Sequence, residues 1–481
     1  MSRAVIFFVA LLFAPVVTAG QGRMTYGVQY SRADESRIRV SIEMAEPLAG
    51  LQTLVMPRAV PMGYGEQPYD RFVGEVKAYG AANEALPVKR EEGPRWILGK
   101  AGAKLRRVAY EVDLERMERE VLSGGDASKV RPGYVGLLGY SVFAYVEGQE
   151  EEPLRLRAEG PSDWPVFSTL APAVPPASGS VTAEVANFYA LADSQIVMGP
   201  NTTIEKIDSA VPLFLVTYSE SATDTRILGR LGAEALEAVF RYFGRAPFAH
   251  YTILQEFLKP VSKLHQYGLS MEHLGSGTFT LGLDRRLTAE SSAEEQMRTR
   301  FNFAHHIAHA WIPKRAYGEG YFPFQWELAP VFDSIWFSEG FAQYAAMDAL
   351  ANAMPEAEAQ KFRERMIELR FRRTLADVPA FLRKMPLVEV SHIASTRYGE
   401  DWRTGRTVFS RGGLMAAEMD ARIRERSQGK KGLRDALQHL MAWSAKEERA
   451  FRIDELPTIF KEATGVETRD ILEKWLAPMK D

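Results

Sequence analysis

Hydrophobic and polar residues alternate along short stretches in the first part of the chain. Stretches 37–42 and 108–112 place an apolar side chain at every second position, which is the pattern of a half-buried β-strand. Glycine and proline residues separate such stretches, as they do in the turns of a β-sandwich. The pattern therefore predicts a β-sandwich domain over residues 22–175.

The pattern changes after residues 171–180, a stretch rich in proline, alanine and serine that is typical of a linker. Beyond it, residues 250–255 and 278–283 again look like strands, whereas from about residue 290 the chain is mostly helical, with few glycine or proline breaks. We therefore expect an α+β protein, in which a mixed domain over 182–350 and a helical domain over 351–481 follow the sandwich.

The first residues carry the pattern of an export signal. Arg3 precedes an apolar run over 5–17, and small residues suited to signal peptidase follow at 17–19. The run is shorter than the roughly 20 residues that a transmembrane helix needs, and no second apolar stretch approaches that length. We expect a signal peptide over 1–19, an exported protein that is periplasmic or secreted, and no membrane association after signal cleavage.

Composition excludes several functional classes. The 59 basic and 62 acidic residues nearly cancel, which argues against nucleic acid as a partner. The chain contains no cysteine, so disulfides, iron–sulfur clusters, thiolate zinc sites and cysteine nucleophiles are excluded. Any metal site must consist of His, Asp and Glu residues, which makes the positions of the eight histidines informative.

Three of the eight histidines fall within five residues, at His305, His306 and His309. Ser292 and Glu295 have the spacing of a capping box, and the helix that they would start continues until Pro313. On such a helix His305 and His309 lie one turn apart on one face and can bind one ion, with His306 at the flank of that face. A packed or solvated histidine-rich turn is the alternative interpretation.

Glu339 is a candidate third ligand. It lies in a second apolar segment, beside Trp336, Phe337 and Phe341, in a helix that we expect to start at Asp333. A lone carboxylate among such residues is costly unless it is paired or binds a metal. A helix glutamate that points to solvent is the alternative.

Both segments resemble the glycyl aminopeptidase family of zinc metallopeptidases, relatives of aminopeptidase N with thermolysin-like catalytic domains. The family shows H-E-x-x-H with a following Trp and Lys-Arg pair, and further along W-x-x-E-G-F; residues 305–315 and 336–341 are similar to these motifs. Residues 269–273, 411–414 and 56–63 are similar to other family segments. The resemblance implies a thermolysin-like zincin domain within 182–350 and hydrolysis of peptide or protein substrates at or near their N-termini.

The resemblance also implies roles for individual residues. Zn²⁺ would be held by His305, His309 and Glu339. Glu272 matches the family glutamate that lies beside the free amino group of the substrate, with a surface charge at a strand end as the alternative.

Two positions depart from the family pattern. The second residue of H-E-x-x-H is the family's general base, and here it is His306, which can act as another base, become a fourth metal ligand, or only fill the space. Relatives carry a tyrosine that hydrogen-bonds the developing oxyanion, and here Phe409 stands at that position, with Tyr398 as a possible substitute.

Three functions therefore remain open. The first is an exported zinc metallopeptidase with impaired catalysis. The second is a catalytically inactive peptidase-fold protein that binds peptides or a protein partner. The third is a closed structural zinc site in which His306 is a ligand.

Overall fold

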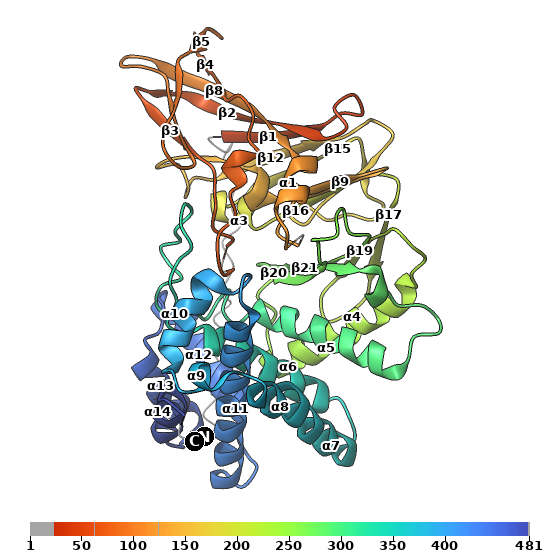
Figure 1. Ribbon diagram of the computed structural model, residues 1–481, viewed down its shortest axis with the longest axis vertical. Helices are drawn as coiled ribbons and strands as arrows, with labels where there is room; N and C mark the ends of the chain where they lie inside the picture. The colour runs from red at the N-terminus through yellow and green to blue at the C-terminus, as the bar shows by residue number, and fades with distance from the viewer. Residues whose placement is uncertain (1–23, 62, 124, 480–481) are drawn as a thin grey trace, which may run out of the picture.

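The computed structural model describes residues 24–479 except 62 and 124. The predicted signal peptide at 1–19 lies outside the described residues. Figure 1 shows a β-rich part at one end of the molecule, a helical part at the other, and a further sheet with helices beside it between them. Among the described residues no helix combines the length and the apolar character needed to cross a membrane.

The β-rich part is built from three sheets. The largest has the order β15 (Ser180–Val185), β12 (Leu154–Glu159), β1 (Met24–Tyr30), β2 (Arg37–Ala49), β8 (Lys104–Asp113), β4 (Lys77–Gly80) and β5 (Ala85–Leu86). A second has the order β14 (Ala177–Ser178), β13 (Pro165–Ser168), β16 (Gln195–Met198), β10 (Tyr134–Leu138) and β9 (Lys129–Arg131). A third has the order β11 (Tyr145–Val146), β3 (Gln52–Val55), β7 (Arg95–Leu98) and β6 (Val88–Arg90).

Alternation along the strands explains how these sheets pack. In β2 the side chains of Ile38, Val40 and Ile42 are buried, and the polar residues between them are more exposed. The buried faces of all three sheets contribute to one hydrophobic cluster. The strand stretches predicted at 37–42 and 108–112 lie within β2 and β8.

The sheets continue beyond the linker that composition predicts at 171–180. β14 lies inside that stretch and pairs with β13, while β15 and β16 pair with β12 and β10. Strand pairing therefore extends the β-rich part to about residue 198, and the predicted end at 175 falls inside it. The proline-rich stretch shows neither a helix nor a strand pattern, so its composition resembles that of a linker. Proline is nevertheless compatible with short edge strands such as β14.

The central sheet has the order β17 (Thr202–Ile207), β18 (Leu213–Ser219), β19 (Tyr251–Leu258), β21 (Ser276–Gly282) and β20 (Gly268–Glu272). β18, β19 and β21 are parallel, and the two edge strands are antiparallel to their neighbours. Every residue of β19 is buried, as expected for a strand covered on both faces. The strand-like stretches predicted at 250–255 and 278–283 coincide largely with β19 and β21.

Most of the remaining regular structure among the described residues is helical. The two long helices beside the central sheet are α4 (Thr225–Phe243) and α5 (Ala293–His309), and the β-rich part contains α1 (Leu114–Glu120), α2 (Gly139–Val142) and α3 (Phe188–Ala192). The remaining helices are α6 (Ala342–Ala351), α7 (Glu356–Met366), α8 (Arg373–Ala376), α9 (Ala380–Arg383), α10 (Leu387–Arg397), α11 (Trp402–Arg426), α12 (Leu433–Glu447), α13 (Leu456–Thr464) and α14 (Arg469–Leu476). One hydrophobic cluster joins the central sheet to these helices.

The helix expected from Asp333 begins with a π-helical turn, η3 (Trp336–Phe341), before α6. The turn lies against α11, and the contact depends on two glycines: a Cβ on Gly412 would overlap the carbonyl oxygen of Trp336, and a Cβ on Gly340 would overlap the backbone of Gly412. The glycines therefore let two helical backbones touch directly. This close approach places α11 beside Glu339.

Candidate metal centre

Helix α5 starts at the predicted capping box. The hydroxyl of Ser292 accepts a hydrogen bond from the Glu295 amide at 3.2 Å, and the Glu295 carboxylate accepts one from the Ser292 amide at 2.7 Å. The helix ends at His309, and its last turn, with all three histidines, is buried. The cap at one end and the buried face at the other set which way the histidines point.

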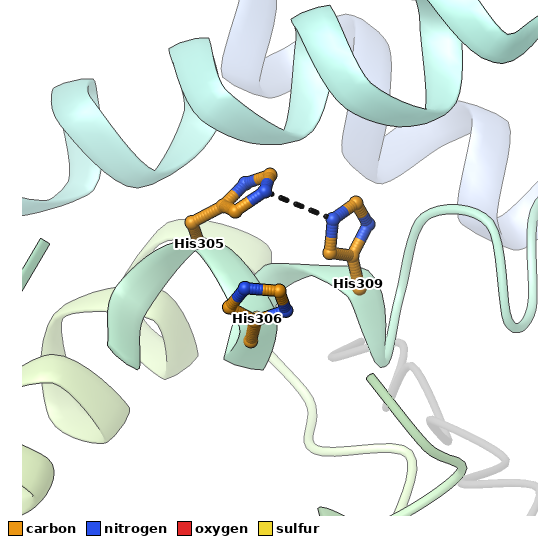
Figure 2. Close-up of side chains that lie close together, drawn as sticks. All are labelled: His305, His306 and His309. Carbon is orange, nitrogen blue, oxygen red and sulfur yellow. Dashed lines mark hydrogen bonds between the residues drawn. The ribbon is translucent and has the colours of Figure 1, made fainter. Parts of the chain in front are cut away.

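Three donor atoms converge at the end of this helix. The Nε2 atoms of His305 and His309 lie 3.2 Å apart, and Oε2 of Glu339 lies 3.5 Å from the first and 3.4 Å from the second. Ligands at about 2.0–2.1 Å from a tetrahedral zinc ion lie about 3.3–3.4 Å from one another. Figure 2 shows the rings of His305 and His309 directed toward each other, with His306 beside them. The three donors therefore fit a common metal ion.

The tautomer of His309 is set by the backbone. Its Nδ1 lies 2.8 Å from the carbonyl oxygen of Ile312, and because a carbonyl only accepts, Nδ1 donates. In the neutral ring the lone pair is then on Nε2, the atom that faces His305 and Glu339. A backbone acceptor on the second ring nitrogen is a common companion of a metal-binding histidine.

The charges of the cluster are strongly coupled. Burial and the neighbouring His309 lower the pKa of His305 to about 3. Burial alone would lower the pKa of His309, but the carboxylates of Glu272 and Glu339 raise it to about 9. Burial alone would raise the pKa of Glu339, whereas His309 and His305 lower it to about 2. A proton on His309 thus stabilises the carboxylates in the absence of a metal ion.

Glu339 lies in the π-helical turn and is only 4% exposed, so the alternative of a solvent-facing glutamate does not hold. The hydroxyl of the preceding Ser338 shares a 2.6 Å hydrogen bond with the hydroxyl of Tyr321. Single π-helical turns occur frequently at functional sites, where they re-aim a side chain.

His306 lies at the flank of the helix face that carries His305 and His309, as helical spacing predicts, and its neighbour is Glu272. Nδ1 of His306 is 3.5 Å from Oε2 of Glu272, and its ring packs edge-on against Phe279. Burial lowers the pKa of His306. A ring nitrogen of His306 also lies within 4.8 Å of donor atoms of His305 and His309, so the residue is close enough to share a metal site with them.

Glu272 ends the edge strand β20 and is buried, so it is not a surface charge. Burial opposes its ionisation, yet His309 and His306 hold its pKa well below the usual range. One of its oxygens lies within 4.8 Å of donor atoms of His309 and Glu339. The structure therefore brings the predicted substrate-binding carboxylate to the predicted metal donors.

A row of aromatic residues lies on another side of the candidate metal donors. Phe409, on α11, lies with its ring 5.8 Å from that of His305, and the ring of Tyr398 lies 6.2 Å from Phe409. Tyr64 follows at 5.0 Å from Tyr398, and its buried hydroxyl has no hydrogen-bond partner among the described residues. Burial and the nearby Glu339 raise the pKa of Tyr64 and Tyr398, so both phenols are neutral donors.

Tyr64 carries no local sequence signal that marks it as a site residue. It lies on the connection between β3 and β4, directly after the segment 56–63 whose similarity to a family segment was noted. Its neighbour Gly65 donates a 2.8 Å hydrogen bond to the carbonyl of Ser395 on α10, which anchors this connection to the helical part. Figure 1 shows the chain after β3 descending toward α10 and β20. Nothing in the local pattern reveals such a contact between distant segments.

The β-rich part and the overall architecture both have counterparts among known proteins. Residues 25–200 match the family described as the Peptidase M61 N-terminal domain. No curated protein matches the chain. A solved structure of an aminopeptidase N family protein from Idiomarina loihiensis is similar, with a TM-score of 0.81 and 20% identity, over 95% of this chain and 76% of that one.

The M1 zinc metallopeptidase of Deinococcus radiodurans is also similar. A variant of it bound to a Tyr-Ser-Ala substrate has a TM-score of 0.53 and 15% identity over 96% of this chain and 95% of that one. A second structure of this enzyme has a TM-score of 0.51 and 16% identity, over 95% and 94%. The chain thus has the α+β fold of M1 aminopeptidases, with an N-terminal β-rich and a C-terminal helical domain. The narrower resemblance to glycyl aminopeptidases stays a prediction.

Proposed function

We propose that this chain is a zinc metallopeptidase homologue whose peptide-bond hydrolysis is impaired. The observation that carries the proposal is the mutual spacing of His305 Nε2, His309 Nε2 and Glu339 Oε2, at 3.2–3.5 Å. The peptidase fold and the hydrogen bond that orients His309 support it. When bound, zinc would supply a Lewis acid and an acidified water for attack on a peptide carbonyl.

The chain's own residues limit what such a site can do. A carboxylate at position 306 would receive a proton and return it to the leaving amine, a function worth about 10² to 10⁴ in rate. His306 has instead a depressed pKa and Glu272 as its neighbour. Phe409 offers a ring without a hydroxyl, and loss of one oxyanion donor costs about 10² to 10³ in rate. Both losses act on the same step.

Glu272 supports a substrate with a positively charged N-terminus. Its ionised carboxylate is buried beside the donor atoms, which is the charge that an ammonium group requires. We therefore propose cleavage or binding at or near peptide N-termini.

The second candidate is a protein that binds peptides or a protein partner without turnover. The residues at positions 306 and 409 favour it, because the base and the oxyanion donor are replaced together. Purified protein analysed for zinc and incubated with a peptide library separates the two. Chelator-sensitive cleavage that His309→Ala abolishes supports the peptidase, whereas stoichiometric zinc without cleavage supports the binding protein. Protein that binds no zinc at neutral pH refutes both as metal proteins.

We also propose that the protein is exported, on the pattern of residues 1–19. Expression of the whole chain with fractionation, followed by N-terminal sequencing of the product, tests this. A product that keeps Arg3 and stays inside the cell contradicts the proposal.

A further inference from the structure

A buried carboxylate of the β-rich part ties together segments on both sides of the metal donors. Oδ1 of Asp193 accepts hydrogen bonds from Lys314 Nζ at 3.2 Å and from His273 Nδ1 at 3.1 Å, and Oδ2 accepts one from the Leu274 amide at 2.6 Å. The side chains of the three charged or titratable residues are at most 1% exposed. Lys314 also donates to the carbonyl of Pro61 at 2.8 Å.

The partners of Asp193 are the neighbours of site residues in the chain. His273 and Leu274 directly follow Glu272 at the end of β20. Lys314 stands two residues after Ile312, whose carbonyl orients His309. Asp193 itself lies between α3 and β16, in the β-rich part. One carboxylate from this part thus holds the turn that carries Glu272 and the segment that orients a metal donor.

The tether depends on charge as well as shape. Lys314 is completely buried, and a buried ammonium needs a carboxylate partner. Burial would raise the pKa of Asp193, but Lys314 and His273 lower it, so the carboxylate is ionised. An asparagine at this position would keep the size of the side chain and leave Lys314 without its counter-charge.

We infer that Asp193 is a positioning residue of the metal centre, which sets the placement of Glu272 and His309 from the β-rich part. The inference rests on the metal site of the proposed function. Partners one step removed from metal ligands commonly change metal affinity by about 10- to 100-fold when they are lost. Since Asp193 acts through Lys314 and the backbone, we expect the lower end of this range.

The chain offers a matched control. Glu256 in β19 accepts a 2.9 Å hydrogen bond from Lys129 in β9 and one of 2.6 Å from Thr280, and Lys129 and Glu256 are both 3% exposed at the side chain. This second buried ion pair also joins the β-rich part to the central sheet. Its side-chain partners, Lys129, Thr280 and Tyr134, lie outside segments 272–274 and 309–315.

The experiment compares Asp193→Asn with Glu256→Gln in the full chain. Melting temperature measures the structural cost, competition with a chromophoric chelator measures zinc affinity, and the visible absorption of the cobalt-loaded protein measures donor geometry. We expect both variants to melt at lower temperature, and only Asp193→Asn to lose about tenfold in zinc affinity and to change the cobalt spectrum. Equal changes in both variants, or a wild-type affinity and spectrum in Asp193→Asn, overturn the inference.

A double variant guards against loss of folding. Asp193→Asn with Lys314→Met removes both charges together, which avoids an unpaired buried ammonium. It should fold and still show the weakened zinc binding, and wild-type binding in it also overturns the inference. A wild-type chain that binds neither zinc nor cobalt instead overturns the proposed metal site, and the inference falls with it. The two failures are therefore distinguishable.

Discussion

Under the proposed function, supplying a carboxylate at position 306 and a phenol at position 409 should raise peptide hydrolysis. The change is His306→Glu combined with Phe409→Tyr. A glutamate is no larger than the histidine that it replaces, and the tyrosine adds one hydroxyl to a ring that already lies 5.8 Å from the ring of His305. The first change supplies a carboxylate for proton transfer and the second a donor for the oxyanion. Both substitutions keep the size of the side chain close to that of the residue replaced.

The expected gain follows from the two functions. Proton transfer contributes about 10² to 10⁴ and the oxyanion donor about 10² to 10³. Because groups that act in one step are not additive, we expect a gain of about 10⁴ rather than the full product. A cost accompanies it: Nδ1 of His306 lies 3.5 Å from Oε2 of Glu272, so a glutamate there would face a like charge. At about 4 Å such repulsion reaches about 4 kcal/mol in a partly screened site, and bound zinc would offset much of it.

The assay is peptide hydrolysis by zinc-loaded protein, with both single variants and a triple variant that adds His309→Ala. The double variant should cleave, a chelator should stop it, and the triple variant should be inactive. Two results would refute the reasoning. One is wild-type hydrolysis as fast as that of the double variant. The other is a folded double variant that holds one zinc ion and still cleaves nothing.

Three further predictions concern the metal and the packing beside it. Because the pKa of His309 is raised to about 9, metal binding must displace its proton, and zinc affinity should rise about tenfold per pH unit up to about pH 9. Calorimetry in buffers of different ionisation enthalpy measures the released proton. A zinc affinity that does not depend on pH contradicts this prediction. X-ray absorption of the zinc protein should show two imidazoles, and a third imidazole would establish His306 as a ligand and the closed structural site. Gly412→Ala should lower the free energy of unfolding by about 2 kcal/mol or more in denaturant titrations, because the new Cβ would overlap the Trp336 carbonyl. Gly399→Ala, a control with open space around the new Cβ, should change the free energy of unfolding little.

The convergence of the candidate metal donors could be predicted because their pattern is local. A spacing of four residues on a helix brings His305 and His309 to one face, and the capping box that starts that helix is visible in the sequence. Glu339 was predictable as a carboxylate among aromatic residues that needs a partner. The β-strands were predictable for the same reason, because alternation is a short-range property.

The rest of the site depends on contacts between distant segments. Asp193, Tyr64 and Lys314 come from three parts of the chain, and no spacing relates them. The contact of His306 with Glu272 joins a helix to the edge strand of a sheet. The motif at 305–309 taken alone therefore shows that position 306 is not a glutamate, but not which residue His306 faces. Composition also misplaced the end of the β-rich part, because proline-rich segments can pair as short edge strands, as β14 does.

The residue at position 306, a histidine here and a glutamate in the family that the motif resembles, affects the charge of the whole site, which leads to a last prediction about substrates. With His306 neutral, the two carboxylates of Glu272 and Glu339 balance a divalent ion, so the zinc-loaded site is neutral. A glutamate at 306 would make it negative, and the ammonium of a peptide would then restore neutrality. In this chain the same ammonium still meets the carboxylate of Glu272, but it leaves the site with a net positive charge, which weakens the preference for a free N-terminus. We therefore expect the zinc-loaded wild type to bind the free and the N-acetylated form of one peptide with affinities within about tenfold of each other. The His306→Glu variant should favour the free form by more than tenfold, because a unit charge at about 4 Å contributes up to about 4 kcal/mol. Calorimetry with the two peptides measures the ratio, with Phe409→Tyr as a variant that leaves the charge unchanged. A strong preference for the free amine in the wild type, equal to that of His306→Glu, would show that Glu272 recognises the ammonium independently of its histidine neighbour.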